Sequence, residues 1–76
     1  MLEELREVAG LGGPAASLAN DLLSFHQQLQ DGELTQEEYQ FLVNEIAEIR
    51  AQQELADDEQ MCRWIVSAAT LLVSAV

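Results

Sequence analysis

The sequence predicts an all-α protein, and three features of the chain support this. Glycine and proline occur only at five positions, Gly10, Gly12, Gly13, Pro14 and Gly32, so residues 33–76 contain no helix breaker. Apolar residues recur at steps of three and four, as on one face of a helix. No run alternates with the period of two that marks a strand. We expect an antiparallel helical hairpin, preceded by a short N-terminal helix and followed by a long or kinked hydrophobic C-terminal helix.

The 76 residues are enough for one small domain. We assign residues 1–12 to the short N-terminal helix and a Gly-rich turn, 14–56 to the helical hairpin, and 57–76 to the hydrophobic C-terminal helix. A chain of this length buries only about 60% of its unfolded surface, so its core is usually marginal. Self-association or docking on a partner is therefore expected before any motif is considered.

The first helix is predicted over residues 2–9, where Leu2, Leu5, Val8 and Ala9 share one side. The segment GLGGP then stops it. Pro14 suits the first position of the next helix, because proline has the φ angle of a helix and the missing N–H is not needed there.

The second helix is predicted from about Pro14 to Gln30. Its large apolar residues recur at steps of four, three and four, which predicts a seam against another helix. They are Leu18, Leu22, Phe25 and Leu29. Gly32 can adopt the left-handed conformation that ends many helices.

The start of the third helix is marked by a capping box. Thr35 is a suitable N-cap and Glu38 stands three residues later, while Leu34 and Tyr39 occupy the positions of a hydrophobic staple. The short turn DGEL between two apolar stripes predicts an antiparallel hairpin. The stripe of the third helix consists of Tyr39, Leu42, Ile46 and Ile49.

The apolar pattern weakens after Ile49. Leu55 is the only large apolar residue in RAQQELADDEQ, which predicts a solvent-facing helix here. Either Asp57 or Asp58 caps a new helix, or the third helix continues. In the second case residues 35–76 span roughly 60 Å at 1.5 Å per residue.

The C-terminal segment is apolar around most of its helical circumference. Its polar residues form one narrow stripe at steps of four, three and four: Arg63, Ser67, Thr70 and Ser74. A helix of this kind is buried in its own core, in an oligomer or in a membrane. The candidate interaction residues are Met61, Trp64, Ile65, Ala68, Leu71, Leu72 and Val76.

Contact with another protein is the preferred interpretation of this segment. Residues 64–76 form about 20 Å of helix, less than the ~30 Å core of a bilayer, so a small membrane-associating protein using residues 61–76 is the second choice. Burial within the monomer would leave part of the apolar circumference exposed, and exposed patches usually mark interaction sites. We expect a homo-oligomer or a subunit of a larger assembly.

The charge of the chain limits its partners. Fourteen acidic residues stand against three arginines, the net charge is −11, and there is no lysine. Direct binding to nucleic acid needs basic residues, so we expect none. A basic protein partner fits better, and an acidic inhibitor of a basic or nucleic-acid-binding host protein is a further alternative. A lone cysteine and an acidic N-terminus predict a cytoplasmic protein, or one in a particle assembled in the cytoplasm.

No residue pattern predicts an enzyme, a cofactor site or a metal site. His26 has no second histidine, serine or cysteine spaced to form a catalytic pair. Cys62 is expected to be a small buried hydrophobe. Asp31 and Glu38 match the second half of a calcium-binding loop. Gln27 and Leu29 occupy its first and third positions, where calcium needs hard oxygen ligands.

The stretch LQDGELTQEEYQFLV resembles the short helical hairpin known as SHOCT, over about residues 22–46. The likeness lies in Leu29, Asp31-Gly32, Leu34, Thr35, Glu37-Glu38 and Tyr39, without the lysines that usually follow. This resemblance implies oligomerisation or docking. The whole chain also resembles the small, acidic, helix-rich proteins of tailed bacteriophages. That likeness implies a structural component of the virion, in the tail or the DNA-delivery apparatus.

Overall fold

The computed structural model describes residues 1–74, and this part of the chain is helical with no strand. The elements are α1 (Leu2–Ala9), α2 (Pro14–Gln30), α3 (Gln36–Glu45), a π-helical turn η1 (Ile46–Arg50), α4 (Ala51–Glu54) and α5 (Glu59–Ser74). Ile46 and Ala51, at the two ends of η1, keep helical dihedral angles. Thus α3, η1 and α4 form one continuous helix, and residues 1–74 contain four helices. The prediction of an all-α chain is confirmed.

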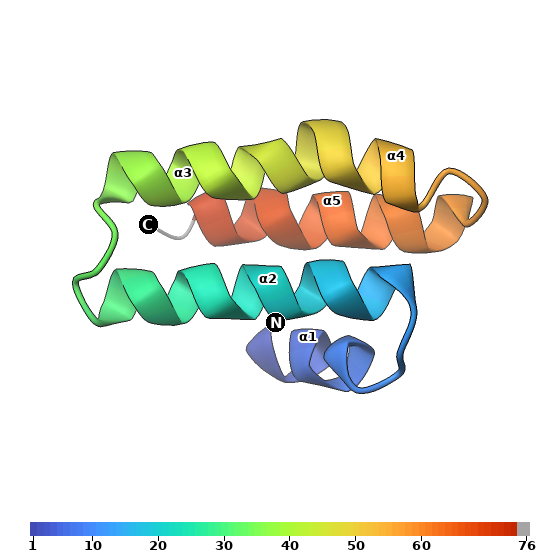
Figure 1. Cartoon of the computed structure of the whole chain (residues 1–76), viewed down its shortest axis with the longest axis horizontal. Helices are drawn as coiled ribbons and strands as arrows, with labels where there is room; N and C mark the ends of the chain where they lie inside the picture. Colours follow the sequence, from blue (N-terminus) through green and yellow to red (C-terminus); the bar gives the residue numbers. More distant parts are fainter. Residues whose placement is uncertain (75–76) are drawn as a thin grey trace.

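The helices form a compact bundle rather than a simple hairpin (Figure 1). Helix α2 and the continuous helix α3–η1–α4 run antiparallel, and α5 returns to pack against both of them. Helix α1 folds back against α2. The hairpin seam is therefore not completed by two helices alone. It is closed by α5, which corrects the expected architecture.

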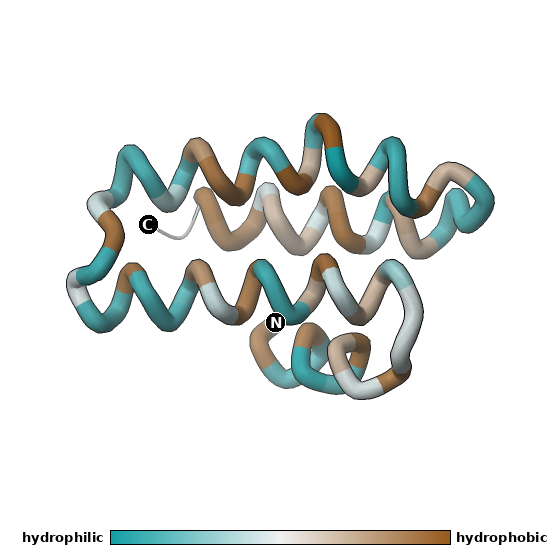
Figure 2. The backbone as a smooth tube through the Cα atoms, in the orientation of Figure 1, coloured by the Kyte–Doolittle hydropathy of each residue, from teal (hydrophilic) through white to brown (hydrophobic). Residues whose placement is uncertain are grey.

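One hydrophobic core joins all four helices. The largest fully buried side chains are Leu5, Leu18, Leu22, Tyr39, Val43, Ile46 and Ile65. Hydrophobic and hydrophilic residues alternate along α2 and α3, as expected for helices with one buried side (Figure 2). Within residues 1–74, no helix combines the length and the apolar character needed to cross a bilayer.

The predicted helix boundaries around the first loop are confirmed. Helix α1 covers residues 2–9, and Pro14 is the first residue of α2. Gly12 and Gly13 have φ angles of +81° and +88°, a conformation that side chains with a Cβ rarely adopt. The Gly-rich turn thus separates the two helices.

The predicted capping box at the start of α3 is present. The Glu38 amide donates to Thr35 Oγ1 at 3.1 Å, and the Thr35 amide donates to Glu38 Oε1 at 2.9 Å. Two of the free amides at the helix start are thereby satisfied. Gly32 has φ +76° in the preceding turn, as predicted.

The buried stripe of α3 differs from the predicted one. Val43 is fully buried, Leu42 is only half-buried, and Ile49 is 49% exposed, so the assignment of Ile49 to the seam is wrong. The prediction that the following residues face solvent is also wrong for Ala51 and Leu55, which are both buried. The stripe recurs at every fourth residue: Tyr39, Val43, Ala47, Ala51 and Leu55.

The turn η1 explains how residues four apart along this helix all stay on its buried side. A regular α-helix has 3.6 residues per turn, so each step of four drifts by about 40° around the helix. In η1 the Ala51 amide donates to the carbonyl of Ile46, five residues earlier, so this turn contains more residues. The wider turn reverses the drift, and Ala51 and Leu55 remain on the core side while Ile49 is displaced outward.

The chain then reverses instead of continuing as a rod. Helix α4 ends at Glu54, and Asp58 Oδ1 accepts a hydrogen bond of 3.1 Å from the Met61 amide, so Asp58 caps α5. The longest dimension of the molecule is 34 Å, about half of what the rod would require. Of the two alternatives left open by the sequence, the structure has the capped new helix.

Candidate interaction surfaces

The candidate residues of the C-terminal helix lie on opposite sides of α5. Ile65, Ala68 and Leu72 are buried, at 0%, 1% and 6% exposure, and they belong to the monomer's own core. Leu71 is 55% exposed, and Met61 and Trp64 are half-buried. Val76 lies outside the described residues. The inner side of α5 thus closes the bundle, and only the other side is available to a partner.

The accessible side of α5 is defined here as the outer stripe, which consists of Trp64, Ser67, Thr70, Leu71 and Ser74. The three hydroxyl residues and Leu71 are exposed, and Trp64 is partly exposed. Trp64 and Leu71 are seven residues apart, which places them on the same side of a helix. No residue from 64 to 74 carries a charge. The stripe is therefore an uncharged surface on a strongly acidic molecule.

Two hydroxyls of the outer stripe are satisfied within the helix. Thr70 Oγ1 donates to the carbonyl of Val66 and Ser74 Oγ to that of Thr70, each at 2.9 Å. A hydroxyl that already donates to its own backbone loses less when water is removed from it. The stripe can be covered by an apolar partner at a small cost in unsatisfied polar groups.

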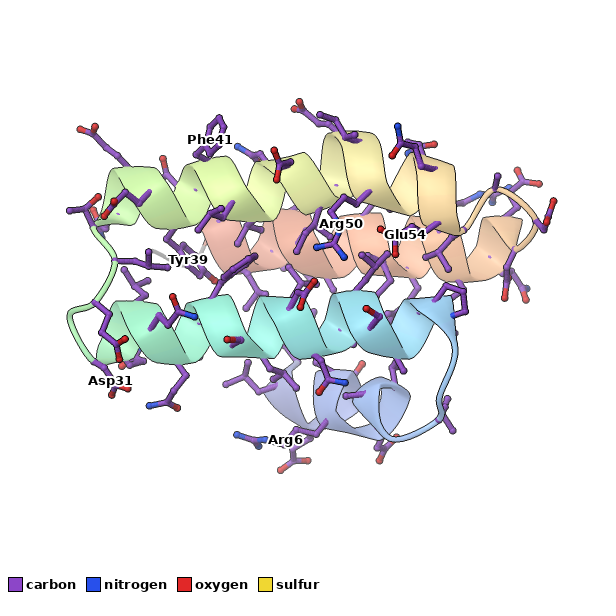
Figure 3. The ribbon with its side chains drawn as sticks, in the orientation of Figure 1. Arg6, Asp31, Tyr39, Phe41, Arg50 and Glu54 are labelled. Carbon is purple, nitrogen blue, oxygen red and sulfur yellow. The ribbon has the colours of Figure 1, made fainter. Side chains whose placement is uncertain are left out.

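A second exposed apolar surface lies on α3, and the sequence reasoning did not identify it. Phe41 is 67% exposed and points away from the other helices, whereas Tyr39, two residues earlier, points into the bundle (Figure 3). Leu34, Glu37, Glu38, Phe41 and Leu42 line an open hollow of about 350 Å³ beside it. We call these residues, together with Glu45, the Phe41 surface. An aromatic residue beside the predicted seam was the sequence signal that could have identified it.

The Phe41 surface is acidic. Glu37, Glu38 and Glu45 are one helical turn from Phe41, at positions that are neighbours on a helix surface. Within residues 1–74, none of these three carboxylates forms a salt bridge. The exposed ring of Phe41 therefore has three carboxylates near it on α3, and no salt bridge within residues 1–74 neutralises them.

Two of the three arginines, Arg50 and Arg63, form salt bridges with carboxylates outside the Phe41 surface. Arg50 Nη1 lies 2.5 Å from Asp21 Oδ2, and its Nε lies 3.0 Å from Glu54 Oε2 (Figure 3). The hydrogen bonds that Arg50 donates to Asp21 and Glu54 raise the pKa of Arg50 above its ordinary value. Arg63 pairs with Glu59 on α5. Arg50 connects η1 to α2, so its role is in the fold rather than at either surface.

The residues considered for chemistry are not brought together. Asp31 accepts a hydrogen bond from Gln27, and Glu38 is part of the α3 cap. Cys62 is half-buried, with its Sγ 3.5 Å from the carbonyl of Ala51. His26 is half-buried on α2. Among residues 1–74, no three His, Cys, Asp or Glu side chains are grouped as metal ligands would be.

Comparison of the chain with protein-family models, with curated proteins and with solved structures finds no match.

Proposed function

We propose that this chain is a non-enzymatic assembly protein whose outer stripe binds a second copy of the chain. The observation that carries the proposal is an uncharged, partly apolar surface from Trp64 to Ser74 on a molecule of net charge −11. In this proposal α5 has two roles. Its inner residues close the core of each monomer, and its outer residues form the contact between monomers.

Electrostatics favour the outer stripe as the surface between copies. Two molecules of charge −11 repel each other, and a contact through acid-bearing surfaces would bring carboxylates together. A contact along residues 64–74 avoids this, because no acid lies in that segment. Burial of Leu71 and of the exposed part of Trp64 supplies the hydrophobic contribution.

The resemblances of the sequence support the same class of function. The SHOCT-like hairpin at residues 22–46 implies oligomerisation or docking, and the likeness of the whole chain to small tailed-bacteriophage proteins implies a place in a virion. We therefore propose a structural subunit of a bacteriophage tail or DNA-delivery apparatus as its setting. The copies would contact one another, or an equivalent neighbour, through α5.

The native mass of the full chain and of Leu71→Asp tests this proposal, measured by light scattering after gel filtration. We expect a defined multimer of the 8.4 kDa chain, and a monomer for Leu71→Asp. Leu71 is 55% exposed, so a carboxylate there meets water in the monomer but a partner in the multimer. Circular dichroism should show the same helix content for both proteins.

Ile49→Asp is the matched control, because Ile49 is a similar aliphatic residue with 49% exposure on η1. This variant should keep the native mass of the unchanged chain. A monomeric full-length chain contradicts the proposal, and so does equal loss of association in both variants. Ile65 and Leu72 cannot serve as probes of the contact, because a carboxylate at either position would unfold the core.

A further inference from the structure

We propose that the Phe41 surface is a second docking site and that its partner is a basic, amphipathic helical segment of another protein. This site lies on α3 and does not depend on self-association through α5. Two observations carry it. They are the exposed aromatic ring beside an apolar hollow, and three neighbouring carboxylates that form no salt bridge within residues 1–74.

The apolar part of the site suits a helix better than a small molecule. Leu34, Phe41 and Leu42 come from the start of α3 and the turn before it, and they are the apolar residues that line the open hollow. Small-molecule sites usually enclose most of the ligand surface, which a surface lined from one helix cannot do. An amphipathic helix needs only an exposed apolar surface on which to place its own apolar residues.

The charged part of the site selects a basic partner. Lysine or arginine residues flanking the apolar face of a docking helix would lie near Glu37, Glu38 and Glu45. Such complementarity favours encounter and excludes acidic competitors. A second copy of this chain would bring the same glutamates against one another, and nucleic acid or an anionic membrane would be repelled for the same reason.

The test uses the full chain and a fluorescein-labelled peptide of leucine and lysine, with leucine recurring at steps of three and four. Binding is measured by fluorescence anisotropy over a series of salt concentrations. We expect binding that weakens as salt rises. Phe41→Ser should weaken it by about tenfold or more, because aromatic anchors carry a large share of the binding energy at such contacts, and tenfold corresponds to about 1.4 kcal/mol.

Two matched controls separate a specific site from general attraction. Glu37→Gln with Glu45→Gln should weaken binding and reduce its salt dependence. Glu3→Gln with Glu7→Gln, on the exposed side of α1, makes the same change of net charge and should leave the affinity nearly unchanged. Leu11→Ser removes a similarly exposed apolar residue, 74% exposed in the loop between α1 and α2, and should also have little effect.

Three results would overturn the proposal. They are no binding of the peptide, equal binding of a scrambled peptide of the same composition, and equal loss in the α1 and α3 glutamine variants. The native mass of Phe41→Ser separates this inference from the assembly proposal. A variant that keeps the multimer but loses the peptide supports the Phe41 site, whatever the result for Leu71→Asp.

Discussion

Tyr39 and Phe41 are two residues apart on α3 and have opposite environments. Phe41 is two-thirds exposed, whereas the Tyr39 side chain is fully buried. Within residues 1–74, the Tyr39 hydroxyl has no hydrogen-bond partner. A buried hydroxyl without a partner costs free energy, because it has lost its bonds to water. The same burial raises the pKa of Tyr39 above its ordinary value.

Tyr39→Phe should therefore leave the free energy of unfolding unchanged or raise it by up to about 1 kcal/mol. The unchanged protein should lose stability above about pH 10, where the tyrosine of the unfolded chain ionises and the buried one does not. The unfolded state then binds fewer protons, so stability falls as pH rises.

Urea unfolding near pH 7 and near pH 11 measures both effects. Tyr39 is the only tyrosine of the chain, so the Phe variant is the direct control for the alkaline loss. A loss of more than about 1 kcal/mol in Tyr39→Phe at neutral pH would mean that the hydroxyl makes a stabilising bond.

At the scale of single elements, the local signals of the sequence located most of the helix ends. Gly12, Gly13 and Pro14 placed the break between α1 and α2, and the capping box placed the start of α3. These signals act within a few residues, so they can be recognised without knowledge of the tertiary structure. Each of these boundaries is confirmed.

The π-helical turn η1 could not be predicted from the sequence, because its cause is not local. In a regular α-helix, buried apolar residues recur at steps of three and four. This rule predicted that Leu42 and Ile49 would be buried. The actual core at Ala47, Ala51 and Leu55 relies on a widened turn that the packing of three helices supports. Alanine at two of these positions also gave no sign of burial, since alanine is common on both sides of a helix.

The two sides of α5 could be predicted only in part. The polar stripe of Arg63, Ser67, Thr70 and Ser74 is exposed, as a stripe in an otherwise apolar helix indicates. Whether the apolar remainder meets its own chain or a partner depends on the space between α2 and α3. The sequence contains no local signal for that space.

Thr35→Ala should lower the free energy of unfolding by about 1 kcal/mol, because it removes the hydroxyl that accepts from the Glu38 amide. Thermal unfolding followed by circular dichroism measures the change. Thr35→Ser is the control, since serine keeps a hydroxyl that can accept from the Glu38 amide. An equal loss of stability in the two variants would show that the hydroxyl of the α3 cap is not the cause of the loss.

At the scale of the whole molecule, the stability of the bundle depends on α5. Ile65, Ala68, Ala69 and Leu72 of this helix belong to the core that α2 and α3 also form. A domain of this size has a small free energy of unfolding, so the loss of one helix from the core is enough to unfold it. The hairpin is therefore not expected to fold alone.

Ile65→Ala should lower the free energy of unfolding by roughly 2–4 kcal/mol, because it leaves a cavity in a fully buried position. Leu71→Ala, at a 55% exposed position of the same helix, should cost well under half of that. A chain ending at Gln60 should lose cooperative thermal unfolding altogether. A truncated chain that still unfolds cooperatively would show that α2 and α3 form a stable unit without α5.

The place of α5 between α2 and α3 has a consequence for the protein during its synthesis. The ribosome makes α2 and α3 first, and the chain grows by roughly 30 residues after Tyr39 before Leu72 is available, which takes some seconds at 5–20 residues per second. During that interval the apolar sides of α2 and α3 have no covering helix. The nascent chain is thus most exposed to chaperones, and to unwanted association, just before α5 is made.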